Sequence, residues 1–553
     1  MVKAQDGERP ALFRPPFDFP LYLSGNFGEL RSNHFHGGID FKTQGVEGKA
    51  IHCIADGYIS RVSVSAGGYG NAIYITHDNG YTSVHGHLKA FSPEVAEVVR
   101  AHQYANETFV VDTIFPAGRF PVRRGEVVAL AGNTGYSFGP HLHMEIRETA
   151  TNEPIDPLPF YMDKIRDTTP PRARAVMLYP QVGKGVVEGK SIKRPFAFGK
   201  NRKIEQSISA WGRIGVGVSA NDYMDGTTNN YGVHTVILLV DGTEVFRSVV
   251  DRFSFEENRM INSWTDYPEY TREGKWYMKS FIAPGNPLRM LHTPAADKGI
   301  VTIDEERIYH FTYRLADLYG NTADYHFTVQ GVPQEIPVAE ADGDICLRWD
   351  EDNFIYEEGV RLVVPRQRLY EDIRMDIRVS APADSSAPSY IYQLGEEVVP
   401  LHDYCSLSIP FRHWPSINPS KYYVAAQRGK WTGSLGGTYE RGMMTAQIRD
   451  FGGSYWIAVD TVAPRVKSIT SPDEWARTEV ITLTMTDAET GIASYKGYVD
   501  GAFVLFAYSS KTRRLTCHLA ETPIEPTGGF HMLELIVEDH CGNVTRYTQA
   551  FRF

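Results

Sequence analysis

The sequence lacks the features that define several large classes of protein. No uninterrupted apolar run approaches the roughly 18 residues that a membrane-spanning helix needs, so we expect no membrane span. Positive charge is in deficit, with 56 Lys and Arg against 67 Asp and Glu among 553 residues, which argues against a long contact with nucleic acid. The first residues, MVKAQDGERP, also lack the apolar core of a secretory signal.

Cysteine is scarce as well. The five cysteines include no Cys-x-x-Cys spacing, which argues against a zinc site built from thiolates. They are Cys53, Cys346, Cys405, Cys517 and Cys541. Two disulfides with one free thiol and five buried thiols are both compatible with this set.

Turn-forming and aromatic residues are abundant, with 49 Gly, 32 Pro and 31 Tyr. This composition favours short strands joined by turns, so we expect a mainly β protein of several domains. One helix is predicted after Ser92, where Pro93 follows an N-cap residue and Val95 and Val99 fall at helical spacing. We expect this helix to pack against a sheet, while a role in lining a substrate groove stays open.

Histidine is unevenly distributed along the chain. Nine of the 18 histidines precede residue 160. Three His-x-His pairs lie in this part: His34/His36, His85/His87 and His141/His143. Three pairs in one segment exceed what chance predicts, and neutral imidazole is the commonest metal ligand in proteins. A metal site within the first 143 residues is therefore the leading interpretation.

The surroundings of two pairs are informative. In RSNHFHGGID, Gly37 and Gly38 disfavour a helix between His36 and Asp40, so we expect a turning backbone whose glycines let the chain approach an ion. In GPHLHMEIRE, the residues alternate as a strand, which places both histidines of HLH on one face and the apolar residues in the core. Either both histidines bind one metal, or one binds while the other assists.

The segment GYTSVHGHLKA supplies the third pair. It is predicted to form a strand from Thr82 to Leu88, which would aim His85 and His87 toward the same face. Alternatively, one of these two histidines is a hydrogen-bonded surface residue.

Together these segments resemble the zinc metallopeptidases of the lysostaphin type, the endopeptidases that cut peptide bonds in bacterial peptidoglycan. The resemblance extends over about residues 21–157 and is carried, in order, by HFHGGIDFKT, IADGYISRV, GYGNAIYITHDNGYTSVHGHL, RRGEVVALAGNTG and GPHLHMEIR. It covers about a quarter of the chain. The remainder is similar to what accompanies this domain in larger multidomain envelope proteins of Bacteroidetes-like bacteria.

The resemblance implies a set of metal ligands. Carried over to this sequence, it assigns His36, Asp40 and His143 as ligands of a Zn²⁺ ion. Three protein ligands leave the fourth tetrahedral position of zinc open, which is typical of a catalytic site.

The resemblance also implies two catalytic histidines that do not bind the metal, His141 of the His-x-His motif and His87. Which of them is the base, and which faces the developing oxyanion, stays open. The family usually carries a tyrosine two residues before His87, where this sequence has His85, so it is open whether His85 joins the site. His34 is interpreted as a bystander.

The implied function is hydrolysis of stem or cross-link peptides of peptidoglycan by attack of a zinc-bound water. D-alanyl–diaminopimelate links are favoured over glycine bridges. The alternative is a catalytically silent wall-binding regulator of other hydrolases, but all five implied positions are intact, which favours the enzyme. Such a substrate implies a periplasmic, envelope or secreted protein, from whose amino terminus a signal peptide has been removed.

Beyond residue 165 the chain contains an internal repeat. DTTPP, LLVDGTEVF and RLADLYGNTADYHF in the first copy are matched, in the same order, by DTVAP, GYVDGAFVLF and IVEDHCGNVTRYTQAF. Each Asp-Gly between apolar runs is typical of a hairpin turn. We therefore predict a metallopeptidase domain over 1–165, immunoglobulin-like β-sandwiches over 166–335 and 459–553, and a β-rich unit of unnamed type over 336–458.

Overall fold

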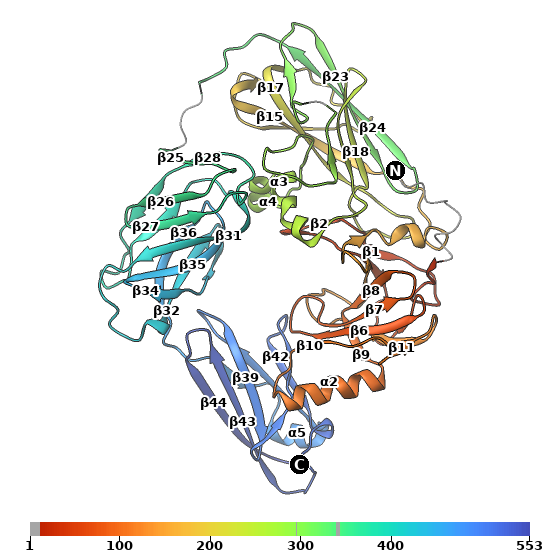
Figure 1. The fold of residues 1–553 in the computed structure, drawn as a ribbon, viewed down its shortest axis with the longest axis vertical. Helices are drawn as coiled ribbons and strands as arrows, with labels where there is room; N and C mark the ends of the chain where they lie inside the picture. Colours follow the sequence, from red (N-terminus) through yellow and green to blue (C-terminus); the bar gives the residue numbers. More distant parts are fainter. Residues whose placement is uncertain (1–11, 295, 339–342) are drawn as a thin grey trace.

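The computed structural model describes residues 12–294, 296–338 and 343–553. The chain is built mainly from antiparallel sheets with a few short helices (Figure 1). The predicted fold class is confirmed: an antiparallel N-terminal sheet is followed by sheets of the immunoglobulin-like sandwich kind. Within the described residues, no helix is both long and apolar enough to cross a membrane.

The N-terminal sheet carries His85 on β8 and His141 and His143 on the neighbouring strand β13. Its order is β1-β4-β13-β8-β7-β6-β10, with β11 beside β6 and β14 beside β13, and a smaller sheet has the order β5-β12-β9. The bounds are β1 Leu23–Gly25, β2 Leu30–Arg31, β3 His34–Phe35, β4 Ile39–Lys42, β5 Ala50–His52, β6 Gly57–Val64, β7 Asn71–His77, β8 Tyr81–Gly86, β9 Leu88–Phe91, β10 Val111–Ile114, β11 Pro121–Val122, β12 Val127–Ala131, β13 His141–Glu148 and β14 Pro154–Ile155.

Helix α2 (Pro93–Ala105) forms where the sequence predicts a helix. Pro93 opens it, and the backbone oxygen of Ser92 accepts the first helical hydrogen bond, although the Ser92 side chain makes no capping bond. Val95 and Val99 are buried toward β9 and β10, so the helix packs against strands as expected.

The unit predicted over 166–335, which we call the first sandwich, has ten strands connected into one sheet, in the order β16-β15-β17-β24-β23-β18-β19-β21, with β20 and β22 beside β17. Helices interrupt it between β19 and β20. The bounds are η1 Leu158–Phe160, β15 Arg172–Val187, β16 Arg194–Ala197, β17 Ile208–Asn221, β18 Thr235–Val240, β19 Thr243–Val249, η2 Phe255–Met260, α3 Ile261–Trp264, α4 Tyr267–Glu273, β20 Met278–Lys279, β21 Leu291–His292, β22 Val301–Ile303, β23 Ile308–Ala316 and β24 Thr322–Gly331.

The remaining two units each pack two main sheets around a core of their own. The third unit has the sheets β26-β27-β31-β35-β34 and β29-β30-β36-β32-β33, and the fourth has β37-β38-β42-β41 and β40-β39-β43-β44. The bounds are β25 Ile345–Leu347, β26 Asn353–Glu357, β27 Val360–Val364, β28 Ile373–Met375, β29 Ile377–Ser380, β30 Ile391–Leu394, β31 Pro400–Pro410, η3 Pro419–Lys421, β32 Tyr422–Arg428, β33 Trp431–Ser434, β34 Thr438–Glu440, β35 Met443–Asp450, β36 Ser454–Val459, β37 Arg465–Ser468, α5 Pro472–Thr478, β38 Val480–Thr486, β39 Ile492–Val499, β40 Ala502–Val504, β41 Ala507–Ser509, β42 Arg514–His518, η4 Leu519–Glu521, β43 Phe530–Asp539 and β44 Val544–Arg552.

The predicted Asp-Gly hairpin is present in each copy of the repeat. Asp241 and Gly242 join β18 to β19 with φ of 50° and 81°, and Asp500 and Gly501 join β39 to β40 with φ of 50° and 83°. Positive φ at both turn residues matches the right-handed twist of the flanking strands, and Asp and Gly tolerate it.

The N-terminal sheet and the first sandwich share one hydrophobic core. Phe253 of the sandwich stacks on Phe27, with ring centroids 5.2 Å apart, and lies 5.3 Å from Phe35. Trp264 of α3 also packs on Phe35, at 6.0 Å. Because Phe35 directly precedes His36, the first motif histidine is supported from outside the segment that resembles the peptidases.

The C-terminal unit returns to the N-terminal unit, so the chain closes into a ring (Figure 1). Arg100 of α2 pairs with Glu521 at 2.8 Å. Glu107, just beyond α2, accepts hydrogen bonds from Lys496 and Tyr498 at 2.8 and 2.9 Å. Helix α2 therefore has two packed faces, one toward its own unit and one toward the C-terminal unit.

All five cysteines are free thiols. Cys346 is exposed and the other four are buried. The two-disulfide alternative is therefore wrong, and the buried-thiol alternative holds for four of the five residues.

Candidate metal centre and active site

Three side chains meet on one face of the N-terminal sheet. Strands β4 and β13 pair in a register that sets Asp40 opposite His143. Directly opposite residues of paired antiparallel strands point to the same face, so the two side chains are brought together by the ladder itself. His36 lies in the turn between β3 and β4, and all three residues are buried.

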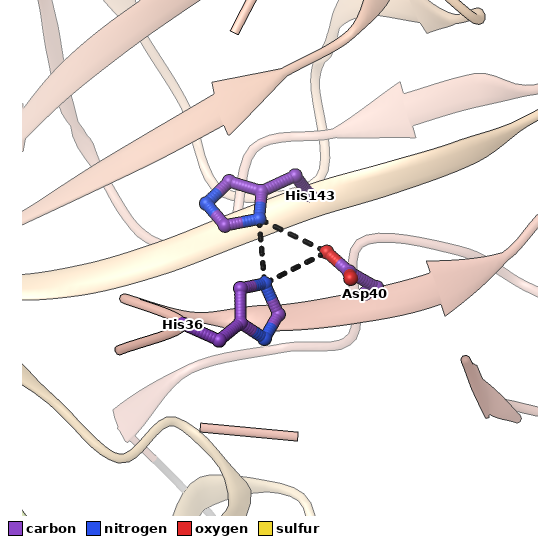
Figure 2. A group of neighbouring side chains, drawn as sticks. All are labelled: His36, Asp40 and His143. Atoms are coloured by element: carbon purple, nitrogen blue, oxygen red, sulfur yellow. Dashed lines mark hydrogen bonds and ion pairs between the residues drawn. The ribbon is translucent and has the colours of Figure 1, made fainter. Parts of the chain in front are cut away.

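The potential ligand atoms converge on one point, as Figure 2 shows. His36 Nε2 lies 3.0 Å from Asp40 Oδ1 and 2.9 Å from His143 Nδ1. His143 Nδ1 lies 2.9 Å from the same Asp40 oxygen. Two imidazole nitrogens and one carboxylate oxygen are a donor set that suits catalytic zinc.

Hydrogen bonds on the far side of each ring orient the lone pairs toward this point. His36 Nδ1 lies 2.7 Å from the backbone oxygen of Asn26, and a carbonyl oxygen only accepts, so Nδ1 carries the proton and Nε2 is free. In His143 the two nitrogens have the opposite roles: Nε2 carries the proton and donates to Glu145 Oε1 at 2.9 Å, and Nδ1 is free. Metal-binding histidines usually have such partners, so the residues present fit a zinc ion.

The protonation of these groups also suits metal binding. Burial lowers the pKa of His36 to about 4, which leaves its ring neutral at neutral pH. Burial acts to raise the pKa of Asp40, but His36 and His143 outweigh it and hold that pKa well below its usual value. Burial also opposes protonation of His143, yet hydrogen bonds to Asp40 and Glu145 raise its pKa to about 9. A metal ion bound here would replace that proton.

Gly37 and Gly38 make room for strand β13. A Cβ atom at Gly38 would lie 2.2 Å from the backbone oxygen of Met144, and one at Gly37 would lie 3.0 Å from Glu145 Oε1. The absence of a side chain therefore lets the turn that carries His36 lie directly on β13.

Two residues of β13 that the sequence interpretation missed support His143. Glu145 accepts hydrogen bonds from His143, from Arg147 Nε at 2.7 Å and from the Tyr69 hydroxyl. Burial acts to raise the pKa of Glu145, but Arg147 and His143 outweigh it and lower the pKa to about 2. The alternation that places His141 and His143 on one face continues through Glu145 and Arg147, so the signal was present in HLHMEIRE.

Replacing Glu145 with glutamine is expected to lower zinc affinity about 10- to 100-fold, because the charged acceptor that orients His143 is lost. A zinc titration against a chromophoric chelator measures the change. Glu148→Gln, on the same strand but bonded to Arg252, is the matched control and should bind zinc like the wild type. Equal affinity of the Glu145 variant and the wild type would contradict the supporting role.

The two predicted catalytic histidines lie beside the three predicted ligands. The ring of His87 is 4.7 Å from that of His141 and 5.9 Å from that of His143. His141 Nδ1 lies 2.8 Å from the backbone oxygen of Gly139, and His87 Nδ1 lies 2.9 Å from that of Thr134. Both rings therefore carry their proton on Nδ1 and keep an Nε2 lone pair.

His85 does not join this group, which corrects the expectation that it is aimed together with His87. In the register of β8 and β13, His85 pairs with Met144, whose side chain is in the core, whereas Gly86 pairs with His143. Strand β8 ends at Gly86, and His87 has a φ of 59°, so the regular alternation is broken there. His85 is fully buried, and burial lowers its pKa to about 3.

His34, the predicted bystander, is exposed, and its ring bonds to the backbone oxygen of Ser32. Asp40 has a further partner that the sequence did not indicate. Arg31 of β2 donates to Asp40 Oδ2 at 2.7 Å, which leaves Oδ1 to face the two imidazoles. The carboxylate is therefore fixed on both sides.

The loop that leads to His141 is held by the C-terminal unit. Lys511, in the turn between β41 and β42, donates to the backbone oxygen of Ser137 at 2.7 Å. The Ser137 hydroxyl in turn lies 3.1 Å from His141 Nδ1. Tyr136 and Phe138 of this loop are 70% and 95% exposed. The C-terminal unit thus reaches the border of the candidate active site.

Two family models match the chain. Residues 34–106 match peptidase family M23, a range that includes His36, Asp40 and His87. Residues 344–460 match the Zu5-like domain, so the unit that the sequence left unnamed is similar to domains of that kind.

Curated relatives align over part of their length. The DD-carboxypeptidase/endopeptidase Mpg of Neisseria meningitidis is 33% identical over 129 residues, which cover 23% of this chain and 23% of the relative. The glycyl-glycine endopeptidase ALE-1 of Staphylococcus capitis is 27% identical over 145 residues, which cover 26% of this chain and 31% of the relative. The matches therefore span less than a third of the length of these relatives.

Solved structures also match about a quarter of the chain. The catalytic domain of the M23 protein EnpA from Enterococcus faecalis is 23% identical, with a TM-score of 0.19, and the match covers 25% of this chain and 87% of that one. The catalytic domain of lysostaphin from Staphylococcus simulans is 22% identical, with a TM-score of 0.19, and the match covers 25% and 91%. The family model and the curated relatives show that the N-terminal part of this chain carries a lysostaphin-type domain of peptidase family M23.

Proposed function

We propose that this protein is a zinc-dependent endopeptidase that hydrolyses peptide bonds in bacterial peptidoglycan. The observation that supports this most strongly is the convergence of His36 Nε2, His143 Nδ1 and Asp40 Oδ1 beside two further imidazoles. These three residues would hold the zinc. Bound there, zinc would polarise the scissile carbonyl and lower the pKa of a water molecule to about 7.

His141 and His87 are the residues to which we assign proton transfer. Burial, together with His143 and His141, lowers the pKa of His87 to about 3, so its ring is neutral at neutral pH. A neutral ring protonated on Nδ1 accepts a hydrogen bond at Nε2, so His87 would orient the attacking water. His141 is the more exposed of the two, and it would take the proton of the water and return it to the leaving amine.

We propose the D-alanyl–diaminopimelate cross-link as the scissile bond. The Neisseria relative is named a DD-carboxypeptidase/endopeptidase and has a higher identity to this chain than the glycyl-glycine endopeptidase does. Because peptidoglycan lies outside the cytoplasmic membrane, the proposal includes a location in the periplasm, in the envelope or outside the cell. The proposal also includes the division of the chain into four units, which end at residues 165, 335, 458 and 553.

Digestion of purified sacculi tests the function. The zinc-loaded protein is expected to convert cross-linked muropeptide dimers into monomers, as measured by mass spectrometry. A chelator should abolish the conversion, and added zinc should restore it, because the ligands stay in place when the ion leaves. Absence of muropeptide release together with absence of bound zinc would refute the proposal and support a catalytically silent regulator.

A further inference from the structure

We propose that the first sandwich binds Ca²⁺, a divalent cation that prefers oxygen ligands, between Asp167, Asp222 and Asp317. One carboxylate oxygen of each residue lies within 4.8 Å of the others. Two oxygens bound to one Ca²⁺ at its usual 2.3–2.6 Å lie at most about 5 Å apart, so a single ion can contact all three residues. The side chains come from three places: the segment before β15, the end of β17 and the end of β23.

Two of the carboxylate oxygens are buried with no partner of their own. Asp167 is 6% exposed and Asp222 is 3% exposed. Among the described residues, nothing donates a hydrogen bond to Asp167 Oδ2 or to Asp222 Oδ1. Leaving a buried acceptor unsatisfied is costly, and more so when it carries charge. The two oxygens therefore point to a ligand that supplies positive charge.

Among the described residues, no positively charged group acts on Asp167 or Asp222. The ionised groups that act on Asp222 are Asp317 and Asp167, and those that act on Asp167 are Asp317 and Asp225, all of them carboxylates. Burial, with this repulsion, raises the pKa of Asp167 to about 6 and that of Asp222 to about 8. A bound divalent cation would remove both the repulsion and the unsatisfied acceptors.

The donor set selects the class of ion. The converging atoms are all carboxylate oxygens, which suit Ca²⁺ or Mg²⁺ and not a soft metal. His234 lines the same cavity, but its ring nitrogens are not among the atoms that converge. The centre of a water-sized sphere can occupy about 10 Å³ of this cavity. The cavity therefore has room for roughly one ion or water molecule.

The second copy of the repeat provides an internal comparison. Asp460, Asp487 and Asp539 are gathered just as closely. There, however, the hydroxyl of Thr490 donates to Asp460 Oδ2 at 2.6 Å, and three backbone N–H groups donate to Asp487 Oδ2 at 2.8 to 3.1 Å. Among the described residues, Asp167 Oδ2 and Asp222 Oδ1 are buried without a partner, whereas no oxygen of this second cluster is, so the proposal is confined to the first copy.

The position of the cluster gives the cation a structural consequence. Its cavity is also lined by Asn26 of the N-terminal unit. The Asn26 side chain bonds to both backbone groups of Gly232 in the sandwich at 2.8 Å, and its backbone oxygen accepts from His36 Nδ1. A cation at the cluster would stiffen the junction on which this contact depends.

Calcium titration of the full-length, zinc-loaded protein tests the proposal. We expect saturable binding of Ca²⁺ in calorimetry, and a rise in unfolding temperature of roughly 5 °C or more at about 100 times the dissociation constant. Asp222→Asn should lose one bound ion and this rise. Asp487→Asn, the matched change in the second copy, should keep the thermal response of the wild type.

The outcomes separate clearly. No Ca²⁺ binding by the wild type, or wild-type stoichiometry and thermal shift in Asp222→Asn, would overturn the proposal. If Asp222→Asn does not fold, Asp317→Asn is measured in its place, with the same loss expected. Replacement of Ca²⁺ by Mg²⁺ at equal concentration should give a smaller shift, because three carboxylates from separate segments do not form a rigid octahedron. An equal or larger shift with Mg²⁺ would overturn the assignment to calcium.

Discussion

Replacing His143 with alanine is expected to abolish both bound zinc and muropeptide release, whereas His141→Ala should abolish release and leave zinc in place. His143 Nδ1 is one of the three converging ligand atoms, and its loss leaves only two. His141 Nε2 lies farther out, 3.6 Å from Asp40 Oδ1, and its loss removes a proton carrier worth about 10²- to 10⁴-fold in rate. Metal content by plasma emission and product analysis by mass spectrometry measure the two effects separately.

His34→Ala is the control for these two substitutions. His34 belongs to a His-x-His pair like the others, but its side chain is exposed and lies outside the converging group. This variant should therefore keep zinc and activity. Activity of His141→Ala and His143→Ala equal to that of the wild type would refute the assigned site.

Replacing Phe253 with alanine is expected to destabilise the protein by about 3–5 kcal/mol, although this residue lies far outside the matched peptidase segment. Its ring is fully buried between Phe27 and Phe35 in the core that the N-terminal sheet shares with the first sandwich. Because Phe35 precedes His36, we also expect weaker zinc binding. Thermal unfolding and zinc titration measure both effects.

Phe354→Ala serves as the comparison, because Phe354 is 75% exposed and its loss should change stability by no more than about 0.5 kcal/mol. If Phe253→Ala unfolds at the same temperature as the wild type, the two units do not depend on a common core.

Arg259 of the first sandwich also links units. It donates to Asn33 of the N-terminal unit at 3.0 Å and to the backbone oxygen of Leu401 in the third unit at 3.0 Å.

Much of the local structure follows from short-range pattern. Pro93 after Ser92 predicted helix α2, and the two Asp-Gly turns predicted the hairpins at residues 241 and 500, because turn and cap preferences depend on neighbouring residues. The alternation in HLHMEIRE also placed His141 and His143 on one face correctly. In the segment GYTSVHGHLKA the same alternation failed to predict the directions of His85 and His87, because a positive φ at His87 reverses the direction of its side chain.

The residue types and spacing by themselves determined that imidazoles and a carboxylate would be available to a metal, and on which strand two of the histidines would stand. Only the tertiary structure decided which atoms meet, because the pairing of β4 with β13 joins residues that are 103 positions apart. The same holds for Asp167 and Asp317, which lie in the repeat, and for Asp222, which no sequence pattern singled out. Long-range packing alone buries their carboxylates together, because local pattern carries no information about contacts between distant strands.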